Sequence, residues 1–390
     1  MLPSPLRAAD CAVPDLAALV QTATNPADCP YAHAIERGVP LYASVDLRAR
    51  LAQDDAAKSF RRALMAEWAH VWSDGPGILV LQAVYDDAAL VDAVTAQFRA
   101  MITEARTSGP AADHFAKPGA NDRVWNALEK LCLRAPELFI AYYGDDLIAT
   151  ACEAWLGPGY QVTSQLNCVN PGGAAQSAHR DYHLGYMAPE QAERYPRHVH
   201  RLSQALTLQG AVAHVDMPLD SGPTLYLPHS QKYAGGYLVA GRDDFQAFFD
   251  SNHVQLPLQK GDAVFFNPAL MHAAGHNRTT DVYRMANLLQ VSCAFGRAME
   301  SVDRLRMASA LYPVLQRMHQ QGHITEQQLA CAAAACAEAY AFPTNLDREP
   351  PIGGLAPESQ PALLLRALHE AWPAQQFIEV AQSQAARKIA

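Results

Sequence analysis

VQLPLQKGDAVFFNPALMH, residues 254–272, decides the fold. The stretch predicts a strand, a turn at Lys-Gly-Asp, and a second apolar strand that ends in a histidine. Apolar runs at 160–170, 202–216 and 282–295 predict further strands. Short strands separated by turn residues at this spacing favour a β-barrel or sandwich over alternating strands and helices.

Both flanks of this β-rich segment are mainly helical in pattern. Residues 13–23 and 57–72 before it, and 301–321 and 325–340 after it, carry apolar residues at helical spacing. A short buried strand is expected at 78–84, between two of the helices. The sequence therefore predicts an α+β protein, with a mainly β core and flanking helices.

The same pattern suggests how the chain is organised. We expect a mostly helical part at 1–159, a catalytic β core at 160–296, and a helical extension at 297–390. No internal repeat or low-complexity tract separates them. The helices are expected to pack on the core, so that residues 1–390 form a single domain.

Composition narrows the classes of partner and location. The formal net charge of -9 argues against nucleic acid or an anionic membrane surface, since both require a basic footprint. No run of about 18 apolar residues is present, and the N-terminus lacks a signal-peptide core. Eight cysteines without a C-x-x-C pair fit free thiols in a reducing compartment. We expect a cytoplasmic protein that acts on a small molecule; the oligomeric state is not predicted.

A candidate metal site follows from two distant stretches. His179 and Asp181 lie in AHRDYHLGY, residues 178–186. Alternate residues of a strand point to the same face, so this imidazole and carboxylate can reach one metal ion. His272, at the end of the opening stretch, would supply a third ligand. Two histidines and one carboxylate form the facial triad of non-haem iron(II) oxygenases, which leaves open positions on the metal.

Other histidines compete for this role. His214 and Asp216 form a second His-x-Asp pair, but Asp216 leads into a Ser-Gly-Pro turn that it is suited to cap. His276 rivals His272 but lies in a turn. His319 and His323 have helical spacing, yet the sequence lacks the H-E-x-x-H glutamate of zinc proteases.

Arg284 lies on the last predicted strand, twelve positions after His272. A buried arginine on a sheet needs an anion, and guanidinium binds a carboxylate through two parallel hydrogen bonds. The anion is either the carboxylate of a ligand or an aspartate or glutamate of the protein.

Three motifs, taken in their order along the chain, resemble those of the phytanoyl-CoA dioxygenase family of iron(II)/2-oxoglutarate oxygenases. They are HRDYH (179–183), D-x-x-x-x-S-G-P-T in 216–232, and GDAVFFNPALMHAAGHNR (261–278) followed by Arg284. The resemblance implies a double-stranded β-helix, a cupin-like jelly roll flanked by helices. It also implies a dioxygenase that uses Fe(II), 2-oxoglutarate and O2, hydroxylates a small molecule, and releases succinate and CO2.

The resemblance also implies roles for individual residues. The iron ligands would be the three residues already singled out, His179, Asp181 and His272. Arg284 would bind the distal carboxylate of 2-oxoglutarate, and Gln165 or Asn167 on an earlier strand would contact the same molecule. Ala274 stands where many members have a hydroxyl residue, so that contact is absent or comes from elsewhere, with Thr224 as the candidate. No catalytic residue beyond the metal ligands is implied.

The sequence gives less information about the substrate than about the metal site or the cosubstrate. Arg180, His183 and Tyr186 are the candidate contacts, and the segments 107–126 and 182–201 are expected to line the entrance. The second segment is locally basic, through Arg180, Arg194, Arg197 and Arg201. This is compatible with an anionic substrate and equally with solvated arginines. Two other functions stay open: a catalytically silent jelly-roll binding protein, and a cupin-like metalloenzyme that does not use 2-oxoglutarate.

Overall fold

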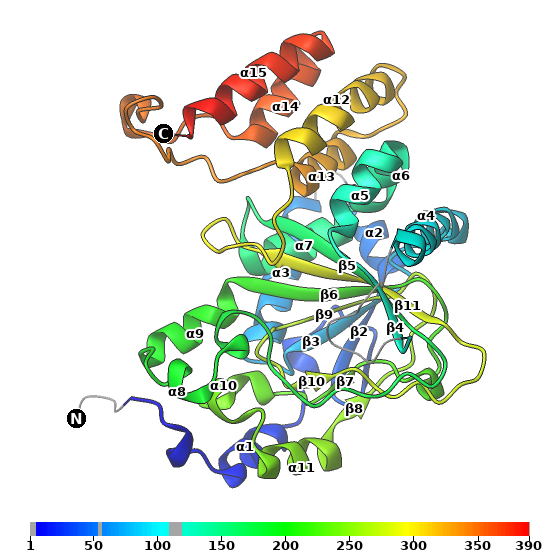
Figure 1. The fold of residues 1–390 in the computed structure, drawn as a ribbon, viewed down its shortest axis with the longest axis vertical. Helices are drawn as coiled ribbons and strands as arrows, with labels where there is room; N and C mark the ends of the chain where they lie inside the picture. The colour runs from blue at the N-terminus through cyan, green and yellow to red at the C-terminus, as the bar shows by residue number, and fades with distance from the viewer. Residues whose placement is uncertain (1–4, 54–56, 109–118, 390) are drawn as a thin grey trace.

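Two β-sheets lie at the centre of the computed structural model, which describes residues 5–53, 57–108 and 119–389 (Figure 1). Within these residues the larger sheet has eight strands in the order β1-β2-β3-β9-β6-β11-β5-β4, and the smaller has the order β10-β7-β8. The larger sheet comprises β1 (Ala34–Glu36), β2 (Val39–Ala43), β3 (Ile78–Gln82), β4 (Asn121–Val124), β5 (Gln161–Val169), β6 (Thr207–Ala213), β9 (Ala263–Phe266) and β11 (Arg284–Ser292). The smaller comprises β7 (Leu225–Tyr226), β8 (Val254–Gln255) and β10 (His272–Ala273).

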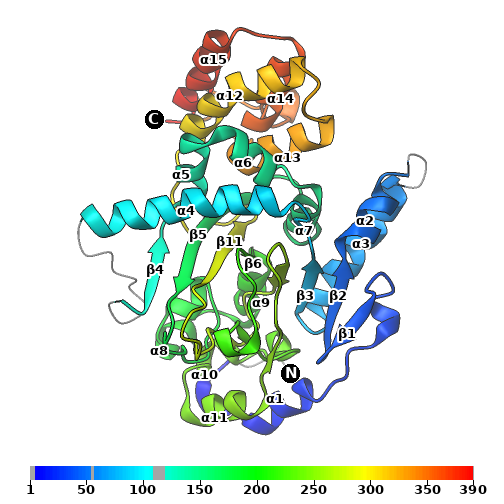
Figure 2. The same ribbon diagram turned by 90° about the vertical axis from the view of Figure 1, so that its right-hand side faces the viewer.

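Fifteen α-helices of the described residues surround the sheets (Figures 1 and 2). Those before the core are α1 (Val13–Val20), α2 (Ser44–Leu51), α3 (Ala57–Ser73), α4 (Ala88–Ser108), α5 (Ala127–Arg134), α6 (Pro136–Tyr143) and α7 (Asp146–Leu156). Those within it are α8 (Pro189–Ala192), α9 (Arg197–Ala205), α10 (Gly236–Val239) and α11 (Asp243–Asn252). Those after it are α12 (Arg304–Gln320), α13 (Glu326–Cys336), α14 (Gln360–His369) and α15 (Ala374–Arg387). The predicted β core with flanking helices is confirmed.

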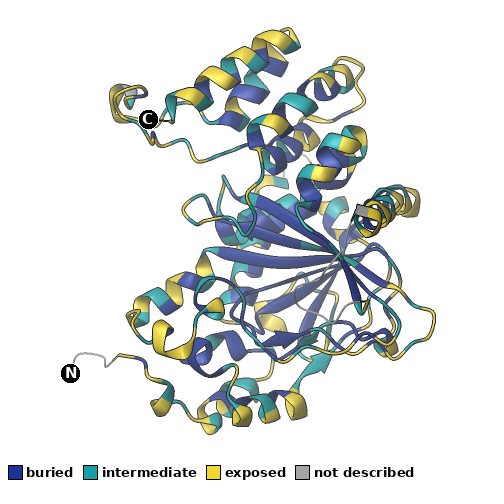
Figure 3. Ribbon diagram, viewed as in Figure 1, coloured by how far each residue is buried: buried dark blue, intermediate teal, exposed yellow. Residues whose placement is uncertain are grey.

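The large sheet packs on helices with one face and lines a cavity with the other, so its strands are largely buried although several carry polar residues. On β11, Met285 and Leu289 pack into the main core against the helices, whereas Ala286 and Leu288 line a cavity on the other face. This alternation is the two-residue period of a strand. The burial colouring in Figure 3 shows the sheet strands buried, while the C-terminal helices expose their outer sides.

Three parts of the predicted organisation needed correction. The run 202–216 was expected to be one strand, but its first four residues end α9 and the strand β6 begins only at Thr207. Apolar content alone does not separate a helix end from a strand start. Strands β1 and β2 were missed in the mostly helical N-terminal part; they pair antiparallel around Gly38, whose φ of 80° suits a tight turn.

The third correction concerns the segment 107–126, which was expected to line the entrance and in which no strand was predicted. Residues 109–118 lie outside the described residues, but β4 (Asn121–Val124) pairs antiparallel with β5. Arg123 of β4 and Trp125, which directly follows this strand, line the cavity described below.

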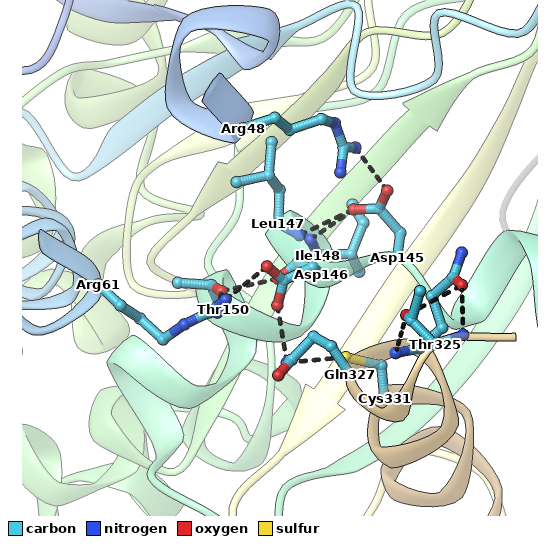
Figure 4. Close-up of polar contacts among 11 residues, drawn as sticks. Arg48, Arg61, Asp145, Asp146, Leu147, Ile148, Thr150, Thr325, Gln327 and Cys331 are labelled. Carbon is cyan, nitrogen blue, oxygen red and sulfur yellow. Dashed lines mark hydrogen bonds and ion pairs between the residues drawn. The ribbon is translucent and has the colours of Figure 1, made fainter. Parts of the chain in front are cut away.

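Polar contacts at the start of α7 connect helices from both flanks (Figure 4). Arg48 of α2 pairs with Asp145 at 2.6 Å, and Arg61 of α3 pairs with Asp146. Gln327 of α13 donates to the other oxygen of Asp146 at 2.8 Å. Because the main apolar core also includes residues of all three parts, we propose that they fold as one domain.

Among the described residues, no helix is both long enough and apolar enough to span a membrane.

Candidate metal centre

His179, Asp181 and His272 meet beside the smaller sheet. His179 and His272 face each other in an antiparallel bridge and exchange backbone hydrogen bonds of 2.9 and 3.1 Å. Asp181 Oδ1 lies 3.6 Å from His179 Nε2, and Asp181 Oδ2 lies 3.3 Å from His272 Nε2. Metal bonds of about 2.0–2.2 Å place neighbouring donors on one ion about 3 Å apart. The donor set therefore fits a single metal ion with only small adjustments.

The two histidines are oriented by the same local device. The Nδ1 of His179 lies 2.9 Å from the carbonyl oxygen of Ser177, and the Nδ1 of His272 lies 2.8 Å from that of Leu270. A carbonyl only accepts hydrogen bonds, so each ring carries its proton on Nδ1. This leaves each Nε2 lone pair directed toward the shared carboxylate, as metal-binding histidines require.

The charge state of the cluster also suits a cation. Burial opposes ionisation of Asp181, but its hydrogen bonds and the neighbouring imidazoles of His272 and His179 hold the pKa of its carboxyl well below the usual value. Burial, with the neighbouring His272, lowers the pKa of His179. At neutral pH the cluster therefore presents one carboxylate and unprotonated imidazole nitrogen, which are the forms that bind metal.

Two further side chains hold Asp181, and one of them was not predicted. Gln209 of β6 donates its amide to Asp181 Oδ2 at 2.5 Å, and the Tyr186 hydroxyl donates to Oδ1 at 3.1 Å. Tyr186 was predicted as a substrate contact; it also lines the cavity. Gln209 could have been noticed as a polar residue inside an otherwise apolar buried strand.

Replacing Gln209 tests this contact. We expect Gln209→Ala to weaken metal binding about 10–100-fold, because partners of the ligands typically contribute that much to affinity. The measurement is a metal titration of the apo-protein. Gln290→Ala is the matched control: Gln290 pairs with Gln209 across the sheet and lines the same cavity, but no contact joins it to Asp181. Equal losses in both variants would contradict a specific role for Gln209.

A cavity of about 770 Å³ opens beside the three donors. The predicted cosubstrate contacts all line it: Arg284, Gln165, Asn167 and Thr224. The oxygen Oδ1 of Asn167 is buried and has no hydrogen-bond partner, whereas Gln165 Oε1 accepts from Arg123 at 3.0 Å. Asn167 thus retains an unused polar atom toward a ligand.

Arg284 is the unusual feature of this cavity. The residue is only 7% exposed, and its Nη1 is buried without a hydrogen-bond partner. Burial lowers the pKa of Arg284 to about 10, so it stays charged at neutral pH. None of the described carboxylates forms an ion pair with it, which leaves the interpretation that a ligand supplies the anion. A buried, unpaired guanidinium is costly without one.

Arg180 and His183, two of the candidate substrate contacts, are engaged with the protein. The guanidinium of Arg180 donates to the carbonyls of Ser230 and Tyr233. As the residue between His179 and Asp181, it faces the opposite side of an extended segment. His183 Nδ1 lies 3.3 Å from the Ser203 hydroxyl, and His183 is not among the described residues that line the cavity.

The remaining candidates lie away from the metal donors. His214 is buried between the hydroxyls of Thr95 and Tyr142, at 2.8 and 2.9 Å, and burial lowers its pKa to about 3. Asp216 accepts a hydrogen bond at 2.9 Å from the backbone of Lys260, which lies in the Lys-Gly-Asp turn and not in the Ser-Gly-Pro turn that Asp216 was expected to cap. Of the four arginines expected to make the entrance basic, only Arg180 lines the cavity. Arg194, Arg197 and Arg201 are not among the described residues that line it.

Comparison with known protein families identifies one family. The profile of the phytanoyl-CoA dioxygenase (PhyH) family matches residues 73–286, more than half of the chain. Dioxygenase trt7 of Aspergillus terreus (strain NIH 2624 / FGSC A1156) is 27% identical over 161 residues, which are 41% of this chain and 46% of that protein. The chain thus aligns with less than half the length of this relative.

Several solved structures are also similar, at greater distance. The α-ketoglutarate-dependent epimerase SnoN from nogalamycin biosynthesis is 19% identical, with 60% of this chain and 82% of that chain covered and a TM-score of 0.42. The carbocyclase SnoK is 20% identical, with 60% and 86% covered and a TM-score of 0.43. AviO1 from Streptomyces viridochromogenes Tue57 is 19% identical, with 57% and 92% covered and a TM-score of 0.41.

Proposed function

The chain belongs to the phytanoyl-CoA dioxygenase family, and on that premise we propose that it is an iron(II)- and 2-oxoglutarate-dependent oxygenase. The observation that carries the proposal is the pairing, in one cavity, of a two-histidine, one-carboxylate donor set with the buried, unpaired Arg284. On this proposal the two sheets form a jelly-roll core.

Each residue then has a defined task. His179, Asp181 and His272 would hold the iron, and all three line the cavity in which cosubstrate and substrate would bind. Arg284 grips the distal carboxylate of 2-oxoglutarate through parallel hydrogen bonds, and Asn167 offers a further polar contact. When bound, iron with 2-oxoglutarate and O2 supplies the oxidant that converts a substrate C–H to C–OH, with succinate and CO2 as the other products.

The cavity supports a small molecule as the substrate. About 770 Å³ is within the usual range of small-molecule sites, and 2-oxoglutarate needs only part of it. Apolar side chains dominate the remaining described walls, including Trp125, Met217, Leu258 and Met299. Arg123 and Arg180 also line the cavity, but Arg123 donates to Gln165, and Arg180 donates to the carbonyls of Ser230 and Tyr233. Because these two guanidinium groups are engaged with the protein, and Arg194, Arg197 and Arg201 are not among the described lining residues, we propose a substrate whose reacting part is apolar rather than anionic.

Arg284 favours this function over the two alternatives. A silent binding protein has no need of a complete donor set, and a cupin-like enzyme without 2-oxoglutarate has no need of a buried guanidinium in the same cavity. We also propose a cytoplasmic location, which the eight free cysteines support.

The proposal predicts iron-dependent release of succinate. Purified protein with Fe(II), 2-oxoglutarate and O2 is screened against a library of small apolar molecules, with succinate measured directly. We expect slow release without a substrate and a clear stimulation by the true one, both lost on omission of iron. Anaerobic Fe(II) and 2-oxoglutarate should also give a visible charge-transfer band. Absence of both the band and the succinate would overturn the proposal.

A further inference from the structure

The ends of three C-terminal helices bring together a second set of metal-binding side chains. His319 lies in the last turn of α12, Glu326 begins α13, and His369 ends α14. Their ligand atoms all lie within 4.8 Å of one another. None of the three lines the cavity of the proposed iron centre. The cluster therefore needs an explanation of its own.

The donors repeat the arrangement found at the first site. His319 Nε2 lies 3.0 Å from Glu326 Oε1, and His369 Nε2 lies 2.9 Å from Glu326 Oε2. In both clusters two imidazole Nε2 atoms thus face different oxygens of one carboxylate. Bonds of about 2.0–2.2 Å to a tetrahedral zinc ion place neighbouring donors about 3.4 Å apart. The two Nε2–Oε distances differ from this value by a few tenths of an ångström, and all the ligand atoms lie within 4.8 Å of one another, so rotation of these exposed side chains would bring all three onto one ion.

We propose that His319, Glu326 and His369 form a divalent transition-metal site, with Zn²⁺ as the preferred ion. Two imidazoles and one carboxylate are a recognised zinc donor set, and a water completes the tetrahedron. The three side chains are 27%, 67% and 51% exposed, so an ion can enter from solvent and keep that water.

The surrounding charges do not oppose a cation. Arg317 on α12 pairs with Glu137 at 2.6 Å, and Arg366 on α14 pairs with Glu358 at 2.9 Å. Hydrogen bonds from the two imidazoles lower the pKa of Glu326, which keeps its carboxylate ionised. A bound ion would replace the protons that those hydrogen bonds now share.

The site would have a structural role, in which the metal links the ends of the three helices. Helix α13 packs against both α12 and α14, and half of its buried residues are alanines: Ala332, Ala333 and Ala335. Such small side chains bury little surface each, so a metal that joins the three helix ends adds a constraint absent from the unfolded chain. An ion that binds only the folded state raises the midpoint of thermal unfolding.

The first test counts bound metal. Apo-protein is titrated with Co²⁺ under anaerobic conditions and the equivalents are read from its visible absorption, with Zn²⁺ used for competition. We expect two equivalents for the wild type and for His323→Ala, a neighbouring exposed histidine outside the cluster. We expect one equivalent for His369→Ala and for Glu326→Gln. Equal counts in the wild type and both cluster variants would overturn the proposal.

A second readout separates this site from the iron centre. His179→Ala should lose the other equivalent and retain this one, so the two proposals fail independently. Excess Zn²⁺ should raise the thermal midpoint of His179→Ala, and the additional His369→Ala replacement should abolish that shift. Circular dichroism checks that each variant is folded. A zinc-induced shift that survives the loss of His369 and Glu326 would also overturn the assignment.

Discussion

Asp181→Ala is expected to abolish stable iron binding and to lower kcat/KM by about a thousandfold or more. The metal supplies several kcal/mol of transition-state stabilisation in such sites, and each 1.36 kcal/mol is about a factor of ten in rate. Asp181 is the only one of the three donors that carries a negative charge, and both histidines point their Nε2 atoms at it. Without it, two neutral imidazoles would face the ion alone. Iron content after anaerobic loading, together with succinate release, measures the loss.

Asp216→Ala is the matched control for this replacement. Asp216 belongs to the second His-x-Asp pair, but it accepts a backbone hydrogen bond from Lys260 and caps a turn. We expect this variant to keep its iron and its turnover. Normal iron loading of Asp181→Ala, or equal loss in the two variants, would contradict the assignment of the metal centre.

The convergence of the three donors could be predicted because each depends on a short local pattern. His179 and Asp181 were placed on one face by strand period alone. His272 was predicted to end the strand after the Lys-Gly-Asp turn, but that strand, β9, ends at Phe266, and His272 instead begins β10 of the smaller sheet. The Nδ1 contacts of both rings to a carbonyl two residues earlier are also local.

The residues that were missed or misplaced depend on how distant segments meet. Gln209 reaches Asp181 only because β6 belongs to the larger sheet, whereas the segment that carries Asp181 pairs with β10 of the smaller sheet, and the two meet at the cavity. Arg180 was expected at the substrate and does line the cavity, but its guanidinium donates to the carbonyls of Ser230 and Tyr233, in a turn about fifty residues away. Its orientation could have been inferred, since it is the odd residue between two ligands on one face. The hydrogen-bond partners of Arg180 could not have been inferred from the sequence.

The N-terminal strands show the same limit on a larger scale. β1 and β2 are only 3 and 5 residues long, too short for their period to stand out from the helical segments around them. β2 joins the sheet through a parallel pairing with β3, which lies beyond an intervening pair of helices. Nothing local in 34–43 specifies that pairing.

Arg284→Met is expected to raise the KM for 2-oxoglutarate by about 100-fold while leaving iron content unchanged. Loss of charge-assisted hydrogen bonds worth about 3 kcal/mol corresponds to that factor. Methionine suits the test because it keeps much of the volume of this buried side chain and removes the cation. Removing an unpaired buried charge should not lower the stability of the apo-protein, since no described carboxylate depends on it. Initial rates at varied 2-oxoglutarate give the KM, and thermal unfolding checks the fold.

Two further variants determine what such a result means. Arg284→Lys keeps the charge but replaces the planar fork with a point charge, so its KM should fall between those of the wild type and Arg284→Met. Arg278→Met, at an exposed arginine paired with Asp220, should leave the KM unchanged. A cupin-like enzyme that does not use 2-oxoglutarate would show no dependence on this molecule in any variant. An unaltered KM in Arg284→Met, in a protein that does consume 2-oxoglutarate, would instead mean that another group binds the distal carboxylate and that the buried guanidinium serves the substrate.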